Sequence, residues 1–314
     1  MFGGNSLAQQ CLSGGGSPSA PVRKLFVVAG QSNAVGLASV KDITQGPKDL
    51  VRDTTVFPNV KIYGIYGAQP GVAGNDDAVL SKGVPWSRFA SWQVARPGFG
   101  YKNVASAPEV FPAGVSAKEV FGPELYLARF LNERAPYEHY IVKLAVSNTS
   151  LNFVADADNW APGSHLFGEL MKMIASAYSD KSSVAQVQVA GLFFMQGETD
   201  ALHEHWAKNY KNNLIEFIEK FRQSMVRMGC AKDYRIPVVI GRIQDNSVWK
   251  FRKYVRNAQE QVSHEILNVA LVNTDDFSEH LVVGGVHFDE YGQARLGERV
   301  YRAFYPLLGR KKDQ

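Results

Sequence analysis

Short apolar runs rich in β-formers alternate with longer amphipathic runs from residue 22 onward, and this alternation most constrains the fold. The run at 24–29, which ends at Gly30, is typical of a strand buried on both faces. Similar runs predict strands at 60–65, 140–145, 188–195 and 236–241, with 269–273 as a candidate short sixth strand. Helical periodicity predicts helices at 123–134, 166–178, 205–228, 251–266 and 291–308. Alternating strands and helices predict a parallel sheet covered on both faces.

We therefore expect an α/β fold, a three-layer αβα sandwich around a five-stranded, mostly parallel sheet. Residues 22–309 form a single domain in this interpretation, preceded by a Gly- and Ser-rich leader or linker at 1–21. The segment 68–122 interrupts the alternation with Gly, Pro and aromatic residues. So long an insertion is expected either to wall a ligand-binding cleft at the strand ends or to form a small satellite hydrophobic cluster.

Composition excludes several classes of protein. No stretch approaches the roughly 20 apolar residues of a membrane-spanning helix. The net charge is +4, but apart from 310–312 the basic residues are dispersed, so no nucleic-acid-binding stripe is present. The leader lacks the basic start and apolar core of a signal peptide. It fits a cytoplasmic enzyme, a fragment of a secreted protein or a phage tail component equally, and the oligomeric state is left open.

Neither a metal, another cofactor nor a disulfide is expected. Cys11 and Cys230 are too few for a ligand cluster or a disulfide framework, and Cys11 lies in the Gly- and Ser-rich leader. His203 and His205 have acidic neighbours, but their spacing matches no metal-binding signature. We expect these histidines to lie at the exposed start of the long helix.

The motif Gly30-Gln31-Ser32-Asn33 directly follows the first predicted strand. A serine at this point lies where the next helix begins, and backbone N–H groups at a helix start stabilise developing negative charge. This position suits a nucleophile beside an oxyanion hole. A serine that merely caps the helix after a glycine turn is the alternative.

Two further motifs are expected at the same edge of the sheet. Gln196 follows the strand at 188–195, and its amide can donate a hydrogen bond to a tetrahedral oxyanion; a turn and helix cap is the alternative. His287 lies in the loop before the last helix, from which an imidazole can deprotonate a serine. A single histidine is more often structural, and it is the combination with Ser32 and Gln196 that indicates catalysis.

In this order, the motifs resemble those of the SGNH-hydrolase superfamily, and specifically its carbohydrate-esterase branch of sialate O-acetylesterases and acetylxylan esterases. The resemblance covers about residues 22–308. Its motifs match at 30–33, 121–125, 196–200 and 287–297. The resemblance implies a flavodoxin-like fold, Ser32 as nucleophile and His287 as base. The implied oxyanion hole comprises the N–H of Ser32, an N–H near Ser147 or Asn148, and the Gln196 amide.

Two positions depart from the pattern of this branch. Where the branch has a glycine pair after the third strand, this chain has Ser147 and Asn148. A backbone donor survives any side chain, and Asn tolerates left-handed geometry better than most residues. Three residues before the histidine, Gly284 replaces the usual aspartate. The site is then a Ser-His dyad, or another carboxylate is the third member: Asp276 is expected, with Asp275, Glu279 and Glu198 as alternatives.

The resemblance implies a serine esterase that removes O-acetyl groups from a carbohydrate such as sialic acid, xylan or a bacterial surface polysaccharide. The implied partner is thus an acetylated carbohydrate. Aromatic residues of the insertion, with Trp160 and Trp206, are candidates for stacking on sugar rings or for the core. A lipid esterase or thioesterase of the same fold is one alternative, distinguished by hydrolysis of long-chain esters. A catalytically weakened carbohydrate-binding protein is the other, distinguished by absence of acetate release.

Overall fold

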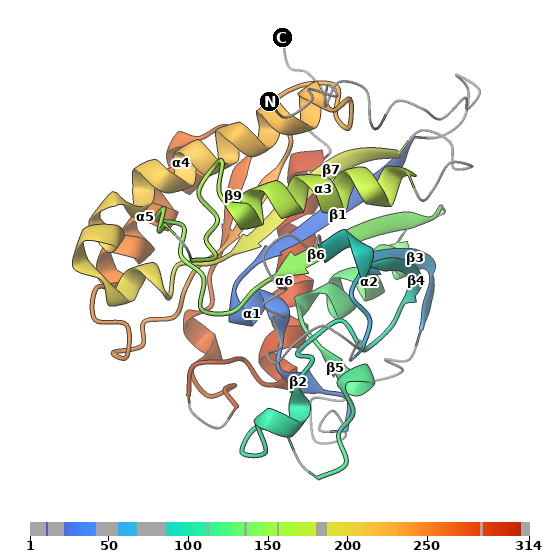
Figure 1. The fold of residues 1–314 in the computed structure, drawn as a ribbon, viewed down its shortest axis with the longest axis horizontal. Coiled ribbons are helices and arrows are strands. Elements are labelled where there is room, and N and C mark those ends of the chain that lie inside the picture. Colours follow the sequence, from blue (N-terminus) through green and yellow to red (C-terminus); the bar gives the residue numbers. More distant parts are fainter. Residues whose placement is uncertain are drawn as a thin grey trace.

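A seven-stranded sheet forms the centre of the protein (Figure 1). The computed structural model describes residues 11, 22–41, 56–67, 86–111, 113–134, 137–155, 157–179, 187–282 and 285–308. In sheet order the strands are β4 (Ser91–Ala95), β3 (Phe57–Gly64), β6 (His139–Ala145), β1 (Arg23–Gly30), β7 (Val187–Met195), β8 (Val238–Gly241) and β9 (Val269–Val272). Every neighbouring pair is parallel except β3 and β4. The α/β prediction is confirmed, but the sheet has seven strands rather than five.

Two strands go beyond the five that were predicted: β9, which was the candidate sixth strand, and β4, which was not predicted. The order β6-β1-β7-β8-β9 is 2-1-3-4-5 along the chain, as in flavodoxin-like sheets. At one edge β3 adds a parallel strand on β6, and β4 adds an antiparallel strand on β3. The candidate sixth strand is β9. The prediction missed β4 because this edge strand is only partly buried, so its sequence lacks the continuous apolar run of a central strand.

Helices cover both faces of the sheet, as predicted (Figure 1). On one face, α3, α4 and α5 pack over Leu25, Val27 and Ala29 of β1; on the other, α2 and α6 pack over Phe26 and Val28. Their bounds are α2 (Pro123–Arg134), α3 (His165–Ser179), α4 (Glu204–Arg227), α5 (Arg252–Glu265) and α6 (Glu290–Leu308). No helix in the described ranges has the length and apolar character needed to cross a bilayer.

Shorter elements connect these layers. They are α1 (Ser32–Val35), the strand pair β2 (Ala38–Ser39) and β5 (Val120–Phe121), and the 3-10 helices η2 (Trp86–Arg88), η3 (Val104–Ser106), η4 (Ala117–Glu119), η5 (Asp200–Leu202) and η6 (Asp275–Phe277). The antiparallel pairing of β2 with β5 ties the chain after α1 to the end of the insertion.

The described part of the insertion at 68–122, residues 86–111 and 113–122, contains regular elements, and 68–85 and 112 lie outside the described residues. It contributes β4, β5 and three 3-10 helices. Together with Leu37, it also forms the satellite cluster that was one of the two expectations, through Ala107, Phe111, Val115 and Val120. Two of its aromatic residues, Trp86 and Phe99, line a cavity of about 30 Å³ at the carboxyl ends of β3 and β6. The satellite cluster is therefore present, whereas the ligand-binding cleft stays a prediction.

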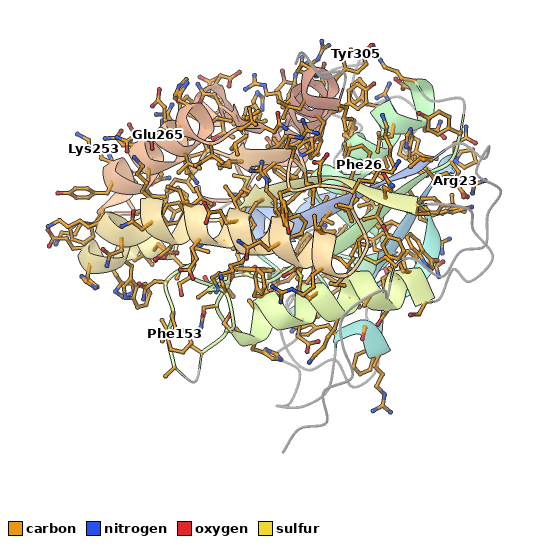
Figure 2. The ribbon with its side chains drawn as sticks, turned by 90° about the horizontal axis from the view of Figure 1, so that it is seen from above. Arg23, Phe26, Phe153, Lys253, Glu265 and Tyr305 are labelled. Carbon is orange, nitrogen blue, oxygen red and sulfur yellow. A yellow bond between two sulfur atoms is a disulfide. The ribbon has the colours of Figure 1, made fainter. Side chains whose placement is uncertain are left out.

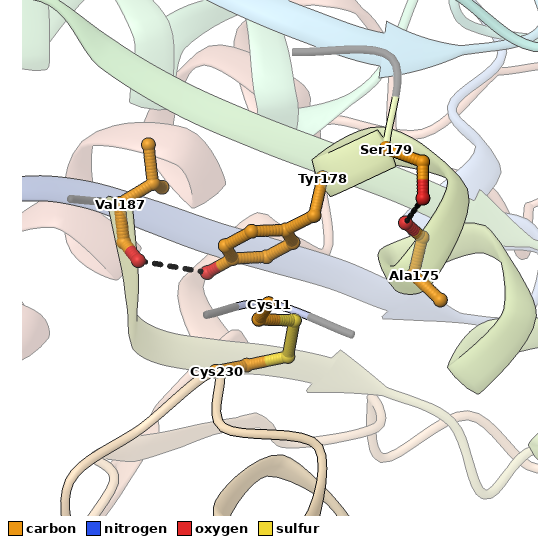
Figure 3. Close-up of a disulfide and its surroundings, with 6 residues drawn as sticks. All are labelled: Cys11, Ala175, Tyr178, Ser179, Val187 and Cys230. Atoms are coloured by element: carbon orange, nitrogen blue, oxygen red, sulfur yellow. Dashed lines mark hydrogen bonds between the residues drawn. A yellow bond between two sulfur atoms is a disulfide. The ribbon is translucent and has the colours of Figure 1, made fainter. Parts of the chain in front are cut away.

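A disulfide joins Cys11 to Cys230, with their Cα atoms 5.0 Å apart (Figure 3). The prediction that these cysteines are not bridged is wrong. The Cys11 N–H donates to the carbonyl of Met228, 3.1 Å away, which places Cys11 beside the turn after α4. The composition of a leader does not reveal such a contact. A bridge across 219 residues restricts the unfolded chain, an effect of about 5 kcal/mol in the chain-entropy model.

Candidate active site

The ends of β6, β1 and β7 lie level with one another at one edge of the sheet. Gly30 pairs with Ala145 on one side and with Met195 on the other. At Gly30, φ is +138°, and a Cβ would lie 1.9 Å from the Met195 carbonyl oxygen, so only glycine fits. The Gln31 N–H donates to that oxygen at 2.8 Å. The residues that follow the three strands therefore emerge side by side.

Ser32 begins α1 directly after this turn. It is 8% exposed. Its carbonyl accepts a hydrogen bond from the Gly36 N–H at 2.9 Å, which closes the single helical turn. Within the described part of the chain, neither the hydroxyl nor the N–H of Ser32 has a hydrogen-bond partner. Both groups are available to a bound ester, the hydroxyl as nucleophile and the N–H as oxyanion donor.

The Asn33 side chain fastens the loop that carries His287 to the chain segment of Ser32. Its Nδ2 donates to the carbonyl of Val286 at 3.2 Å, and its Oδ1 accepts from the N–H of Phe288 at 3.0 Å. One amide thus bonds the residues on either side of His287. Since Asn33 is adjacent to Ser32, this clamp ties the loop of His287 to the chain segment that carries Ser32. The motif at 30–33 did not by itself predict this role for Asn33.

The His287 ring is buried, and this burial affects its protonation. Burial lowers its pKa to about 4, so the imidazole is unprotonated from mildly acidic pH upward. No described residue forms a hydrogen bond with the ring. The ring is free to accept a proton from a serine once a substrate completes the site.

Asn148 provides a second candidate oxyanion donor after β6. Its φ is +58°, the left-handed conformation that the sequence had suggested asparagine would tolerate there. Asn148 is exposed, and its N–H bonds to no acceptor among the described residues. Ser147 is half-buried beside it. The replacement of the glycine pair therefore preserves an unusual backbone conformation at this position.

The amide of Gln196, the expected oxyanion donor, is held by hydrogen bonds inside the protein. Its Nε2 donates to the carbonyl of Thr149 at 2.9 Å and to Asp200 at 2.6 Å, and it lies 3.3 Å from the Gln31 side-chain oxygen. Rotating the amide would place its oxygen beside the Asp200 carboxylate, so this orientation is fixed. Both amide hydrogens are engaged inside the protein, and the side chain is fully buried. The geometry does not support direct donation to an oxyanion and places Gln196 in the supporting framework.

Asp200 anchors the loop that follows Asn148. Its carboxylate accepts the N–H of Leu151 at 2.8 Å and the N–H of Asn152 at 2.9 Å, besides the Gln196 amide. Burial raises the pKa of Asp200, whereas these hydrogen bonds lower it. The carboxylate thus fixes the segment after β6 against the segment after β7.

Asp276 is not brought to His287. Both its oxygens accept hydrogen bonds from Arg299 of α6, and its side chain is 63% exposed. Arg299 lowers the pKa of this carboxyl. Asp275 pairs with Arg256 at 2.6 Å. The expectation for Asp276 is thus not supported, because arginines of the flanking helices bind the loop carboxylates; Gly284 lies outside the described residues.

Glu198 is the buried carboxyl connected to the clamp. Its Oε1 lies 3.3 Å from Nδ2 of Asn33, and its Oε2 has no partner among the described residues. Burial raises the pKa of Glu198 to about 7, with a smaller contribution from the Asp200 charge. The folded state therefore favours the protonated form, and this stabilising contribution is lost as pH rises from the ordinary value of 4.5 through about 7.

A buried ion pair supports the other end of α1. Lys143 of β6 binds Glu124 of α2 and donates to the carbonyl of Val35 at 2.7 Å. Glu124 also accepts the Gly122 N–H at 2.9 Å. This pair explains the motif at 121–125, which holds α1 in place. A lysine inside the apolar run at 140–145 was the sequence signal for a buried partner.

The remaining sequence candidates lie outside this constellation. Trp160 is fully buried, and its indole N–H donates to the Thr149 hydroxyl at 2.9 Å, so it belongs to the core. Trp206 is half-buried, with its ring centroid 3.9 Å from that of His203. No three His, Cys, Asp or Glu residues of the described segments are grouped as a metal site.

The chain is an esterase of the SGNH type, as its family shows. The sequence profile of the carbohydrate esterase family, sialic acid-specific acetylesterase, matches residues 22–306. The chain belongs to this family and is a carboxylic ester hydrolase.

Solved structures share the fold. The crystal structure of NanS is similar with a TM-score of 0.63 and 16% identity, covering 91% of this chain and 98% of that one. A protein from Arabidopsis thaliana is similar with a TM-score of 0.60 and 18% identity, and the match covers 91% of this chain and 99% of that one. A carbohydrate acetylesterase from Xanthomonas citri is similar with a TM-score of 0.51 and 16% identity, and the match covers 89% of this chain and 55% of that one. No curated protein sequence matches the chain.

Proposed function

We propose that this protein is a serine esterase that removes O-acetyl groups from a carbohydrate through an acetyl-enzyme. The family supports the substrate class. The Asn33 clamp is the observation that carries the mechanism, because it bonds both neighbours of His287 and is itself adjacent to Ser32. Acyl transfer requires a serine hydroxyl and a neutral imidazole that can take its proton, and Ser32 and His287 supply these two groups in the proposed mechanism.

In the first half of the reaction, Oγ of Ser32 attacks the acetyl carbonyl carbon while His287 takes the hydroxyl proton. The carbonyl oxygen gains the negative charge, which the N–H groups of Ser32 and Asn148 stabilise. As the intermediate collapses, the bond from the acyl carbon to the sugar oxygen breaks. His287 gives its proton to that oxygen, and the sugar leaves as an alcohol.

In the second half, water attacks the acetyl-enzyme and His287 takes one of its protons. The second tetrahedral intermediate uses the same two backbone donors. Its collapse breaks the bond between the acyl carbon and Oγ of Ser32, and the histidine returns the proton to that oxygen. Acetate is released and the free enzyme is restored.

Phe153 provides a binding surface for the sugar. It lies in the loop after β6 that Asp200 anchors, five positions beyond Asn148, and its side chain is 64% exposed. Figure 2 shows it projecting from this loop away from the body of the protein. An exposed ring on a fixed loop beside the hole offers an apolar face on which a pyranose packs.

Replacing Phe153 with alanine should lower kcat/KM for an acetylated oligosaccharide about fivefold to tenfold. This is the decrease expected when one contact between an aromatic ring and the sugar is removed. Hydrolysis of 4-nitrophenyl acetate should stay unchanged, because this small ester does not reach the ring. Acetate release and nitrophenol release measure the two rates. Tyr234→Ala is the matched control, since Tyr234 is an exposed aromatic residue (58%) in the loop before β8.

Two outcomes would count against the proposal. If the wild-type protein releases no acetate from acetylated sialic acids, xylans or bacterial polysaccharides, the carbohydrate substrate is wrong. If Phe153→Ala slows both substrates equally, the ring supports the site rather than binds sugar.

Replacing Asn33 with alanine should lower kcat about 100-fold with little change in KM, because a loosened His287 no longer meets the serine in the reactive geometry. Steady-state kinetics on 4-nitrophenyl acetate measure this effect. Asn132→Ala is the control: Asn132 likewise bonds a backbone group, the N–H of Asn59, but on the exposed face of α2. Turnover of Asn33→Ala within threefold of wild type would show that the clamp does not position the base.

A further inference from the structure

A second cavity lies far from Ser32, at the opposite edge of the sheet. It has a volume of about 170 Å³ and is bounded by the first residues of β1 and β6 and by α2 and α6. Lys24, which lines it, precedes Ser32 by eight positions along an extended strand, a separation of roughly 25 Å. Figure 2 shows Phe26 and Tyr305, two of its lining residues, toward the Arg23 end of β1 and away from Phe153.

The walls of this cavity are apolar and rich in rings. They include Phe26, Leu127, Leu131, Tyr301, Phe304 and Leu308. The rings of Phe26 and Phe304 lie 5.1 Å apart, and a cavity of about 150 Å³ with comparable lining binds benzene in another protein. The space therefore accommodates one six-membered ring, and aromatic walls favour an aromatic occupant.

Three basic side chains line the cavity, and the guanidinium of one of them, Arg134, lies 6.0 Å from the centre of the Tyr301 ring. His139 is 4% exposed, yet its Nδ1 has no hydrogen-bond partner in the described structure. Lys24 and Arg134 also line the cavity, and no carboxylate of the described residues forms an ion pair with either. Lys24 and His139 both line this cavity, and the Lys24 charge contributes to the lowered pKa of His139. Two cations and an orphaned imidazole nitrogen match an anion with oxygen acceptors.

The geometry points to a binding site for a small aryl carboxylate. Its ring fills the apolar space between Phe26 and Phe304, and its carboxylate lies between Lys24 and Nδ1 of His139, with Arg134 at the rim. No role in ester hydrolysis is implied, because none of these residues lies at the Ser32 edge.

Occupancy should change the titration of His139. Burial lowers the pKa of His139 to about 4, and the Lys24 cation adds to this effect. A carboxylate beside both groups opposes the Lys24 charge and accepts a hydrogen bond from the ring, so binding should raise this pKa. An uncharged ligand of the same shape should not raise it.

The test is a titration of the full chain with benzoate and with benzamide, its uncharged counterpart. Calorimetry measures affinity, and NMR of the His139 ring measures its pKa. Benzoate should bind at least about tenfold more tightly than benzamide, because a charge-assisted contact is lost in the amide. Benzoate alone should raise the His139 pKa, in wild type and in Ser32→Ala alike.

Lys24→Met keeps the apolar stem of the side chain and should weaken benzoate binding about tenfold while leaving benzamide unchanged. His139→Phe should have a similar effect. Arg302→Gln, a cation removed from α6 outside the cavity, should bind benzoate as wild type does. Absence of benzoate binding at millimolar concentration, equal affinity for benzamide, or binding that leaves the His139 pKa unchanged would overturn the proposal.

Discussion

Replacement of Ser32 by alanine should reduce hydrolysis of 4-nitrophenyl acetate by about 10⁶-fold, the loss seen when the nucleophile of a serine hydrolase is removed. Without Oγ no acetyl-enzyme forms, and the remaining backbone donors can only assist direct attack by water. The variant should fold normally, because the Ser32 hydroxyl bonds no described residue. Stopped assays of nitrophenol release, with circular dichroism, measure both properties.

Ser164→Ala is the matched control. Ser164 has the same exposure as Ser32, 8%, but its hydroxyl donates to the carbonyl of Asn159 ahead of α3. This variant should lose stability and keep its activity. Turnover of Ser32→Ala within tenfold of wild type, with normal circular dichroism, would remove Ser32 from the mechanism.

Replacement of His287 by alanine should cost at least about 10⁴-fold in turnover, because the imidazole that takes the serine proton in the proposed mechanism is removed. Asp276→Asn should change turnover less than about threefold, because the exposed pair with Arg299 contributes less than about 1 kcal/mol. Steady-state kinetics on a small acetyl ester compare the two variants directly. The contrast tests a Ser-His dyad against a triad that uses Asp276.

The reverse ordering is equally informative. If Asp276→Asn is as damaging as His287→Ala, then Asp276 moves to the histidine when substrate binds, and the dyad interpretation is wrong. Glu198→Gln extends the comparison to the buried carboxyl. It retains an oxygen for the Asn33 hydrogen bond, so a loss close to that of His287→Ala would make the Glu198 charge part of the mechanism.

Much of the fold could be predicted from the sequence because the burial of a strand or helix produces a recognisable pattern of apolar residues within that segment. A strand covered on both faces must be apolar throughout, as at 24–29, and a helix covered on one side must repeat with the helical period. The antiparallel edge strand β4 has no such apolar pattern, since it is only partly buried and pairs on one side. The bridge from Cys11 to Cys230 left none either, because it depends on a contact across 219 residues.

The sequence by itself determined which residue types follow each strand: a serine after β1, Asn148 after β6, Gln196 after β7, and a histidine before α6. The carboxyl ends of parallel strands lie at the same edge of the sheet. The prediction of parallel strands was therefore enough to place these segments at one edge. Only the tertiary structure decided how each side chain is used. Hydrogen-bonding capacity is finite and is shared among neighbours distant in sequence. Gln196 donates its amide hydrogens to Thr149 and Asp200. Asp276 binds Arg299, and Asn33 fastens the loop that carries His287.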